Sequence, residues 1–225
     1  MSRVGIVLLS FSRGLENGST LRVRFTDRQD GDVNSEVAFL EEREHWAVTE
    51  QVHGASVATV SSGGHLDMAK ADCLFTEATS VICVIKTADC VPITMYGGSC
   101  FVAVHAGWRG LASGVIGAAA NIFKERKCNP RAIIGPHIKV DEYEFGNSDL
   151  KRLGEEFGMH LIGATAAGFP ALDLSSWVFS ELEKSGVQVD HNVDRCTSAD
   201  ERYFSYRKNG DIGRMAMLTE IEPRP

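Results

Sequence analysis

The sequence lacks the features that mark several large classes of protein. No apolar run approaches the ~18 residues that a transmembrane helix needs, so we expect no membrane span. Basic residues are outnumbered, with 23 Lys and Arg against 30 Asp and Glu, and a net charge of −7 is unusual for a nucleic-acid-binding protein. With 225 residues, 44% of them hydrophobic, the chain can bury a core and is not disordered. We therefore expect one globular domain over residues 1–225, with neither membrane nor nucleic acid as a partner.

The cysteines lack the spacing of known cysteine motifs. There are six, at positions 73, 83, 90, 100, 128 and 196, and no two are separated by the two residues of a zinc knuckle or a redox pair. The N-terminal segment Met1-Ser2-Arg3-Val4-Gly5 shows no clear signal peptide. We therefore expect a cytoplasmic protein with reduced thiols, in which any metal site is assembled from distant segments.

Several catalytic signatures are also missing. The sequence has no GxxxxGK[ST] phosphate loop, no GxGxxG after a strand, no GxSxG elbow, no HExxH and no HxE…PCxxC deaminase signature. Each absence removes a family but not a reaction, because another arrangement of residues can perform the same chemistry.

The hydrophobic pattern predicts strands in the middle of the chain, with helices between and after them. Leu21, Val23 and Phe25 alternate with arginines, which is typical of a half-buried strand. We expect further strands at residues 4–9, 48–52, 57–60, 81–86, 92–96, 100–105, 133–134 and 214–221. Helices are expected at residues 35–46, 111–122, 149–157 and 173–184, the last with Asp173 as its N-cap and Gly186 at its end. This mixture predicts an α+β fold, a single domain with mixed β-sheets flanked by helices and with a metal site at strand ends.

Three segments place a metal-binding or nucleophilic residue at a predicted strand end, beside glycine or a turn. They are Gln51-Val52-His53-Gly54, Thr87-Ala88-Asp89-Cys90-Val91-Pro92 and Ala103-Val104-His105-Ala106-Gly107-Trp108-Arg109-Gly110. Two imidazoles and a thiolate form a three-ligand zinc set that leaves a fourth position for water or substrate. Such a zinc ion would lower the pKa of bound water towards ~7.

The residues alone leave simpler interpretations open. A lone Cys90 is more often a small buried hydrophobic residue, and a lone His53 or His105 is more often a hydrogen-bonded core residue. Cys90 and His105 also fit the thiolate and base of a cysteine hydrolase or amidase, which would need no metal.

Three further residues are candidates for the surroundings of the site. His137, which follows Gly135 and Pro136, is expected in a turn that lines a cleft. Asp72 and Asp89 are candidate carboxylates behind the ligands or in proton transfer, and a regular strand would turn Asp89 away from the face of Cys90.

In this order, the three segments resemble the signatures of the multicopper polyphenol oxidase (laccase-domain) family, whose members are also described as purine nucleoside phosphorylases. The resemblance extends over roughly residues 24–221. It includes Ile134-Gly135-Pro136 with Tyr143-Glu144, and also Cys196-Thr197, Phe204-Ser205-Tyr206-Arg207 and Gly213-Arg214. The chain departs from the family in a shortened N-terminal region and in having His137 where many members carry cysteine, which leaves substrate preference open.

The resemblance implies a function and a set of site residues. The implied metal ligands are His53, Cys90 and His105, usually with zinc, and copper is the alternative. Cys90, His105 and Arg109 are the implied catalytic residues. The substrate and phosphate pocket is expected to contain Gln51, Arg109, Arg207 and Arg214. The implied reaction is phosphorolysis of adenosine, inosine or methylthioadenosine, and some members also deaminate adenosine, so the expected partners are a purine nucleoside and phosphate.

The histidine content argues against a copper polyphenol oxidase. A multicopper centre typically uses His-x-His pairs, and this chain has seven histidines and no such pair. A blue-copper site would add a weak axial ligand, for which Met95 is the nearest candidate. Another alternative is an editing factor for a cell-wall precursor, with a structural metal, although such a site normally has a fourth protein ligand.

Arginine suits phosphate because its planar fork bonds two oxygens at once. We expect phosphate to bind Arg109 together with the N-terminus of the helix that begins at Leu111. Without the resemblance, Arg207 would equally be a solvated charge in a hairpin.

Overall fold

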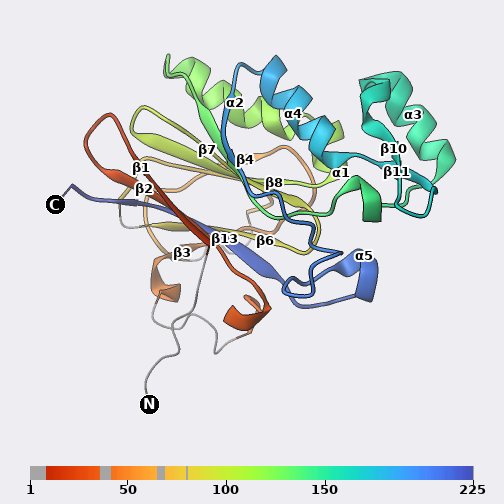
Figure 1. Ribbon diagram of the computed structural model, residues 1–225. Helices are drawn as coiled ribbons and strands as arrows, with labels where there is room; N and C mark the ends of the chain where they lie inside the picture. Colours follow the sequence, from red (N-terminus) through yellow and green to blue (C-terminus); the bar gives the residue numbers. More distant parts are fainter. Residues whose placement is uncertain (1–8, 36–41, 65–68, 80, 225) are drawn as a thin grey trace.

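The computed structural model describes residues 9–35, 42–64, 69–79 and 81–224 (Figure 1). Its strands are β1 Leu9–Gly14, β2 Thr20–Phe25, β3 Trp46–Ala47, β4 Val57–Thr59, β5 Cys73–Thr76, β6 Ile82–Thr87, β7 Val91–Gly97, β8 Cys100–Ala106, β9 Arg131–Ile134, β10 Ile162–Ala164, β11 Pro170–Leu172, β12 Gln188–Asn192 and β13 Met215–Glu222. Its α-helices are α1 Trp108–Ala112, α2 Val115–Glu125, α3 Asn147–Phe157, α4 Leu174–Lys184 and α5 Tyr206–Asn209. Short 3-10 turns are η1 Arg28–Asp30, η2 Arg43–His45, η3 Val140–Glu142 and η4 Met159–Leu161.

The strands form two large mixed sheets and one small hairpin. The five-stranded sheet has the order β1-β2-β13-β6-β3, the six-stranded sheet has the order β12-β9-β7-β8-β5-β4, and β10 pairs with β11. Within the six-stranded sheet, β7 runs antiparallel to β8 and β9, whereas β4 runs parallel to β5 and β12 parallel to β9. This mixed α+β architecture confirms the predicted fold class.

Strand β8 shows how the layers are built. Val102, Val104 and Ala106 pack in the cluster that lies under the helices. Phe101 and Ala103 point the other way, into the cluster shared with the five-stranded sheet. Because side chains alternate along a strand, His105 shares the inter-sheet side with Phe101 and Ala103, at the end of the strand.

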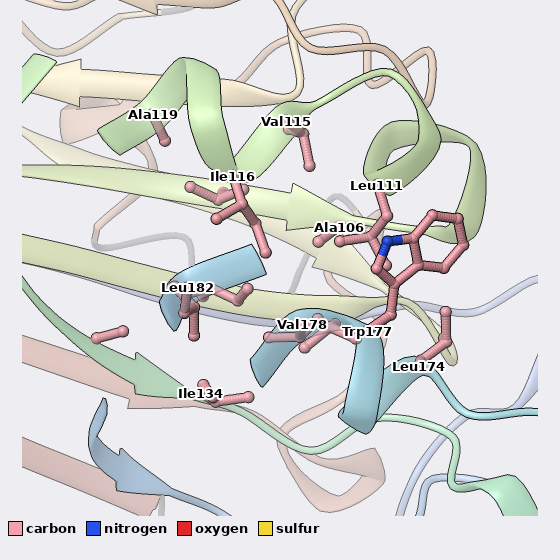
Figure 2. Packing of buried hydrophobic residues seen from close by; sticks show 14 of the residues in the cluster. Ala106, Leu111, Val115, Ile116, Ala119, Ile134, Leu174, Trp177, Val178 and Leu182 are labelled. Carbon is pink, nitrogen blue, oxygen red and sulfur yellow. The ribbon is translucent and has the colours of Figure 1, made fainter. Parts of the chain in front are cut away.

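Helices α2 and α4 cover the outer face of the six-stranded sheet (Figure 1). Figure 2 shows Val115, Ile116 and Ala119 of α2 near Trp177 and Val178 of α4, and all five are buried. Full burial of such side chains contributes about 1.5–3 kcal/mol each, which makes this layer the main apolar support behind β7 and β8. None of the helices in the described residues is long and apolar enough to cross a membrane.

Most predicted elements are present. Strands β2, β4, β6, β7, β8, β9 and β13 and helices α3 and α4 lie where the pattern predicts them, within a residue or two. Asp173 caps α4 by accepting a hydrogen bond from the amide of Ser176, and Gly186, next to the C-cap residue, has a φ of 71°. All six cysteines are free thiols, as expected.

The predicted strand at residues 48–52 is wrong. The strand in this region is β3, and within 48–52 only Glu50 forms an isolated bridge, to Lys70. The side chain of Gln51 bonds the backbone of Lys86 instead, and the amide of Val52 is taken by the carboxylate of Asp72. Side-chain acceptors therefore replace the strand ladder here.

The single helix predicted at residues 111–122 is two helices. Helix α1 begins at Trp108 and ends at Ala112, and α2 begins at Val115. Gly114 between them has a left-handed φ of 81°, which ends the first helix despite the continuous apolar periodicity.

The other differences concern several strands and two helices. Strands β10, β11 and β12, most of β1, and helix α5 are absent from the prediction. Strand β5 is absent from the prediction, and its four residues are buried. The predicted helix at 35–46 lies partly outside the described residues, and its described end is the 3-10 turn η2 followed by β3. The predicted strand at 4–9 also lies outside them, except for Leu9, where β1 begins.

Candidate metal centre

Three residues that are far apart in the sequence meet at one end of the two sheets. His53 lies in the loop between β3 and β4, Cys90 lies between β6 and β7, and His105 lies in β8. One possible ligand atom from each falls within 4.8 Å of those of the other two. The Cys90 Sγ lies 3.8 Å from His53 Nε2, and the two imidazole rings meet edge to face with centroids 4.9 Å apart.

The buried carboxylate of Asp72 forms hydrogen bonds with two of these residues, His53 and His105. Asp72 accepts backbone hydrogen bonds from Val52, His53 and Gly54, at 3.2, 3.0 and 2.7 Å. It also lies 2.8 Å from His105 Nδ1. A carboxylate only accepts, so His105 donates through Nδ1 and its Nε2 is left for Cys90 or a metal. The three amides also stabilise His53 in its left-handed backbone conformation, with a φ of 59°.

The lack of a side chain at Gly107 leaves space for Cys90 and His53. A Cβ atom at this position would lie 2.9 Å from Cys90 Sγ and 2.9 Å from His53 Cδ2. Both distances are too short for a carbon contact, so the cysteine and the imidazole can approach this backbone only at a glycine.

The surroundings of Cys90 and His105 favour the charged form of each residue. Burial opposes the Cys90 thiolate, but the imidazoles of His105 and His53 outweigh it and lower the pKa of Cys90 to about 6. Burial also opposes a charged His105, but Cys90 and Asp72 outweigh it and raise the pKa of His105 to about 9. For Asp72, burial is outweighed by the hydrogen bonds from His105 and Gly54, which lower the pKa of its carboxyl. The group therefore favours a thiolate beside an imidazolium near neutral pH.

This donor set fits a metal ion such as zinc. In a tetrahedral zinc site the sulfur and nitrogen ligands lie roughly 3.6 Å apart, close to the 3.8 Å between Cys90 and His53. Within the described part of the chain, no other group of three such residues has this arrangement. Among the described residues the group has three ligands, and a zinc ion held by three protein ligands keeps a fourth position for water or substrate.

The group lies in a cleft of about 800 Å³, a volume suited to a small-molecule ligand. Arg109, Arg207, Arg214 and Lys86 line the cleft with positive charge, and Glu50 and Asp89 are its acidic residues. Its remaining lining residues are Asn34, Thr49, Gln51, His53, Thr87, Ala88, Cys90, His105, Trp108, Tyr143 and Tyr206. The cleft thus carries more cations than carboxylates, although the whole chain is acidic.

Arg109 and Arg207 are supported by aromatic rings rather than by carboxylates. Arg109 stacks over Trp108 with 4.5 Å from its guanidinium carbon to the ring centroid, and Arg207 stacks over Tyr143 at 4.7 Å. Phe145 lies between, with its ring edge-on to Trp108 at 5.5 Å and to Tyr143 at 5.6 Å. Among the described residues neither arginine has an ion-pair partner, so both remain available to an anion.

Arg214 and Gln51 also lie in the cleft wall, and both side chains make hydrogen bonds to the protein backbone. Arg214 donates from one guanidinium nitrogen to the carbonyls of Asp211, Ile212 and Gly213, each at 2.9 Å. Gln51 accepts from the amide of Lys86 and donates to its carbonyl, both at 2.8 Å. Both side chains therefore shape the wall, and their predicted contact with substrate stays a prediction.

Helix α1 differs from the expected phosphate site. Arg109 is the second residue of α1 and does not precede a helix that begins at Leu111. Because this helix has only five residues, an anion here would rely on the arginine charge rather than on a helix dipole.

His137 does not line a cleft. It is 1% exposed, and its ring contacts the carbonyl of Gly135 at 2.8 Å and the hydroxyl of Ser175 at 2.9 Å. Burial and the neighbouring Lys139 lower the pKa of His137 to about 4. The residue is therefore a neutral part of the core.

The aromatic residues of the cleft were missed as site residues. Trp108, Tyr143 and Tyr206 belong to the quoted sequence motifs, but none of the three was named as a site residue. For Trp108 the available signal was its position next to Arg109, since cation–π stacking needs an aromatic ring close to the guanidinium, whereas no local signal joins Tyr143 to Arg207. Burial raises the pKa of Tyr143 to about 12, so it remains a neutral phenol.

Comparisons with known proteins agree with this architecture. The model of a family described as multi-copper polyphenol oxidoreductase laccase matches residues 27–222. A relative from Escherichia coli (strain K12), named purine nucleoside phosphorylase YfiH, is 32% identical over 176 residues, covering 74% of this chain and 70% of the relative. A relative from Streptomyces coelicolor, also named a purine nucleoside phosphorylase, is 32% identical over 172 residues, covering 74% of this chain and 71% of the relative.

Two solved structures have the same fold. YlmD from Geobacillus stearothermophilus has a TM-score of 0.75 at 22% identity, covering 97% of this chain and 100% of that one. YfiH from Bacillus licheniformis has a TM-score of 0.75 at 20% identity, covering 89% and 92%.

Proposed function

This chain belongs to the multi-copper polyphenol oxidoreductase laccase family, and from that premise we propose that it is a zinc-dependent purine nucleoside phosphorylase. Its substrates are adenosine, inosine or methylthioadenosine, together with phosphate. A phosphate oxygen attacks C1′ of the ribose and the glycosidic C–N bond breaks. The purine leaves with the bonding electrons and takes up a proton, and the products are the free base and ribose 1-phosphate.

The observation that carries this proposal is the content of one cleft. It contains a His-Cys-His group and, close by, Arg109 and Arg207 without ion-pair partners among the described residues. A phosphorylase needs an anion site next to the reacting carbon, and two arginines suit a phosphate dianion because each can bond two oxygens. The names of the relatives support the same chemistry.

Each part of the cleft has a role in this proposal. His53, Cys90 and His105 would hold the zinc ion, which would act as a Lewis acid. Arg109 and Arg207 bind and orient phosphate. The exposed ring of Tyr206 and the half-buried ring of Trp108 offer stacking faces for the purine ring. Asp72 orients His105 and the His53 loop.

The surroundings favour zinc over copper. Among the described residues that line the cleft there is no methionine, and Met95 is fully buried in the cluster under the helices. A blue-copper site would normally have a weak axial ligand of this kind. A polyphenol oxidase with several coppers would also need further ligand groups, and within the described residues only this one is present.

The test is an assay of the purified protein with inosine and phosphate. Zinc is measured by elemental analysis, and hypoxanthine and ribose 1-phosphate are quantified before chelation, after chelation and after zinc is restored. We expect both products in equal amounts, loss of activity on chelation and recovery with zinc. Arg109→Ala should raise the KM for phosphate by about 10- to 100-fold, the cost of losing hydrogen bonds to a charged group. Arg22→Ala, on the exposed face of β2 and paired with Glu222, is the matched control.

Other outcomes identify the alternative functions. Ribose 1-phosphate formed at an unchanged rate without metal would favour a thiol mechanism using Cys90 and His105. Oxidation of a phenol by the copper-loaded protein would favour an oxidase. No turnover of any nucleoside by the zinc-loaded protein would favour a binding role, such as editing of a cell-wall precursor. Ammonia released from adenosine without phosphate would add the deaminase activity implied by the family resemblance.

A further inference from the structure

Asp89 precedes Cys90, and its carboxylate bonds the backbone of α5 rather than the metal group. Its carboxylate accepts a hydrogen bond from the Thr197 hydroxyl through Oδ1 and another from the Arg207 amide through Oδ2, each at 2.7 Å. Asp89 is 7% exposed and Thr197 is 1% exposed, so this contact is shielded from water. Both oxygens are thus occupied by protein donors.

The backbone of Asp89 is held in an unusual conformation. Its φ is 96°, in a region that side-chain-bearing residues rarely adopt. The backbone carbonyl of Asp89 accepts a hydrogen bond from the Ile138 amide at 3.0 Å. With this irregular backbone, Asp89 lines the same cleft as Cys90. The Asp89 carboxylate nevertheless bonds Thr197 and Arg207 and is not part of the His-Cys-His group, in agreement with the expectation that it is not a metal ligand.

The position of helix α5 is fixed by hydrogen bonds to residues outside the helix. It has four residues, too few to be stable alone, and Arg207 is its second residue. Ser205 caps it by accepting from the Lys208 amide, and the guanidinium of Arg207 donates to the Glu144 carbonyl at 3.1 Å. Asp89 is the anchor that joins this helix to the segment carrying Cys90.

We propose that Asp89 is a positioning residue, whose carboxylate holds Arg207 at a fixed place relative to the metal group so that phosphate is bound beside it. This assignment rests on the proposed function. It assigns Asp89 to positioning rather than to proton transfer, since its two oxygens accept hydrogen bonds from the Thr197 hydroxyl and the Arg207 amide.

Three variants separate positioning from proton transfer. Asp89→Gly removes the carboxylate without strain at a φ of 96°. Asp89→Asn keeps one acceptor for the Arg207 amide and one donor for the Thr197 hydroxyl, which can also accept, but it cannot ionise. Thr197→Val removes one of the two hydrogen bonds. Thr219→Val is the matched control, because Thr219 is also fully buried and its hydroxyl bonds Thr94 at 2.8 Å in the core.

Asp89→Gly should raise the KM for phosphate about tenfold, as expected for a lost hydrogen bond to a charged group, while kcat and zinc content remain close to wild type. Thr197→Val should shift the KM in the same direction by a smaller factor. Asp89→Asn should restore the KM to within about threefold of wild type, and Thr219→Val should leave it unchanged. The proposal is overturned if Asp89→Gly leaves the phosphate KM unchanged, or if Asp89→Asn lowers kcat about a hundredfold, as loss of a general acid or base would.

A second readout does not need activity. Limited trypsin digestion, followed by mass spectrometry, reports cleavage after Arg207 and Lys208. It should be faster in Asp89→Gly than in wild type and unchanged in Thr219→Val. If the wild-type protein fails to phosphorolyse inosine, the proposed function fails. In that case, faster cleavage in Asp89→Gly would still support the positioning role, and an unchanged rate would contradict it.

Discussion

The chemistry of each cysteine in this protein depends on the neighbours of its sulfur. Cys73 and Cys83 are fully buried, and burial raises the pKa of both thiols far above the usual range. Burial also raises the pKa of Cys100, to about 12. Cys90 is the exception, because two imidazoles outweigh its burial and lower its pKa to about 6.

This difference predicts how Cys90 reacts in the chelator-treated protein. A thiol whose pKa is lowered is ionised at all pH values above the new pKa, and the thiolate is the reactive form. Alkylation of Cys90 by iodoacetamide should therefore rise with a midpoint near pH 6, instead of the ~8.5 of an ordinary cysteine. Peptide mass spectrometry after timed labelling measures the rate at each cysteine.

Cys73 and Cys83 serve as internal controls, since they should remain unlabelled while the protein is folded. Cys90→Ser should abolish the fast labelling. A midpoint near ~8.5 at Cys90 would contradict the thiolate–imidazolium pair.

At the scale of elements, caps and side-chain acceptors decide where helices and strands begin and end. The Asp72 carboxylate takes the amides of residues 52–54, which cannot then join a strand ladder. Asp173 has the same kind of role at α4, where its two oxygens accept from the amide and the hydroxyl of Ser176, at 2.9 and 2.7 Å.

The cap of α4 can be tested by stability. Asp173→Ala should reduce the free energy of unfolding by about 1 kcal/mol, because the amide of Ser176 loses its acceptor. In a protein of this size that corresponds to a Tm about 2–4 °C lower. Thermal unfolding followed by circular dichroism measures the change.

Asp173→Asn is the matched variant, since asparagine caps helices about as well as aspartate. It should unfold close to the wild-type temperature. An alanine variant as stable as the asparagine variant would show that this cap does not contribute to stability.

At the scale of the whole molecule, the site joins three parts of the fold. His105 comes from the six-stranded sheet, Cys90 from the connection between the two sheets, and His53 from a loop held to Asp72. An ion bound by all three would link these parts in the folded state. It would have no such site in the unfolded chain.

Removal of the metal is therefore expected to destabilise the protein. Zinc at a hundred times its dissociation constant adds about 2.7 kcal/mol, so chelation should lower the Tm by roughly 5–10 °C. Differential scanning calorimetry of the zinc-loaded and the chelated protein measures this shift. Cys90→Ser, which loses one ligand, should respond much less to the chelator. Equal Tm values for the loaded and chelated wild-type protein would contradict a metal at this group.

Much of the fold could be predicted because its signals are local. Residues 21–25, 100–105 and 173–184 carry apolar periods and a capping aspartate that act within a few positions along the chain. The break between α1 and α2 was missed because the apolar period continues across Gly114, and the glycine conformation depends on tertiary packing. Strand β5 was missed because it is short and fully buried, and such a segment has no alternating pattern.

For the site, the sequence by itself determined the residue types. A cysteine, two histidines and several arginines at the positions of the family motifs made a metal and an anion the candidate ligands, whereas the residues alone left other interpretations open. Only the tertiary structure decided their geometry. It brings ligand atoms of His53, Cys90 and His105 within 4.8 Å of one another and buries His137 in the core. It also places Asp72 in hydrogen-bond contact with His105, and Asp89 with the amide of Arg207. The physical reason is that hydrogen bonds between residues 20 to 118 positions apart depend on how the two sheets pack, and no local pattern in the chain encodes that packing.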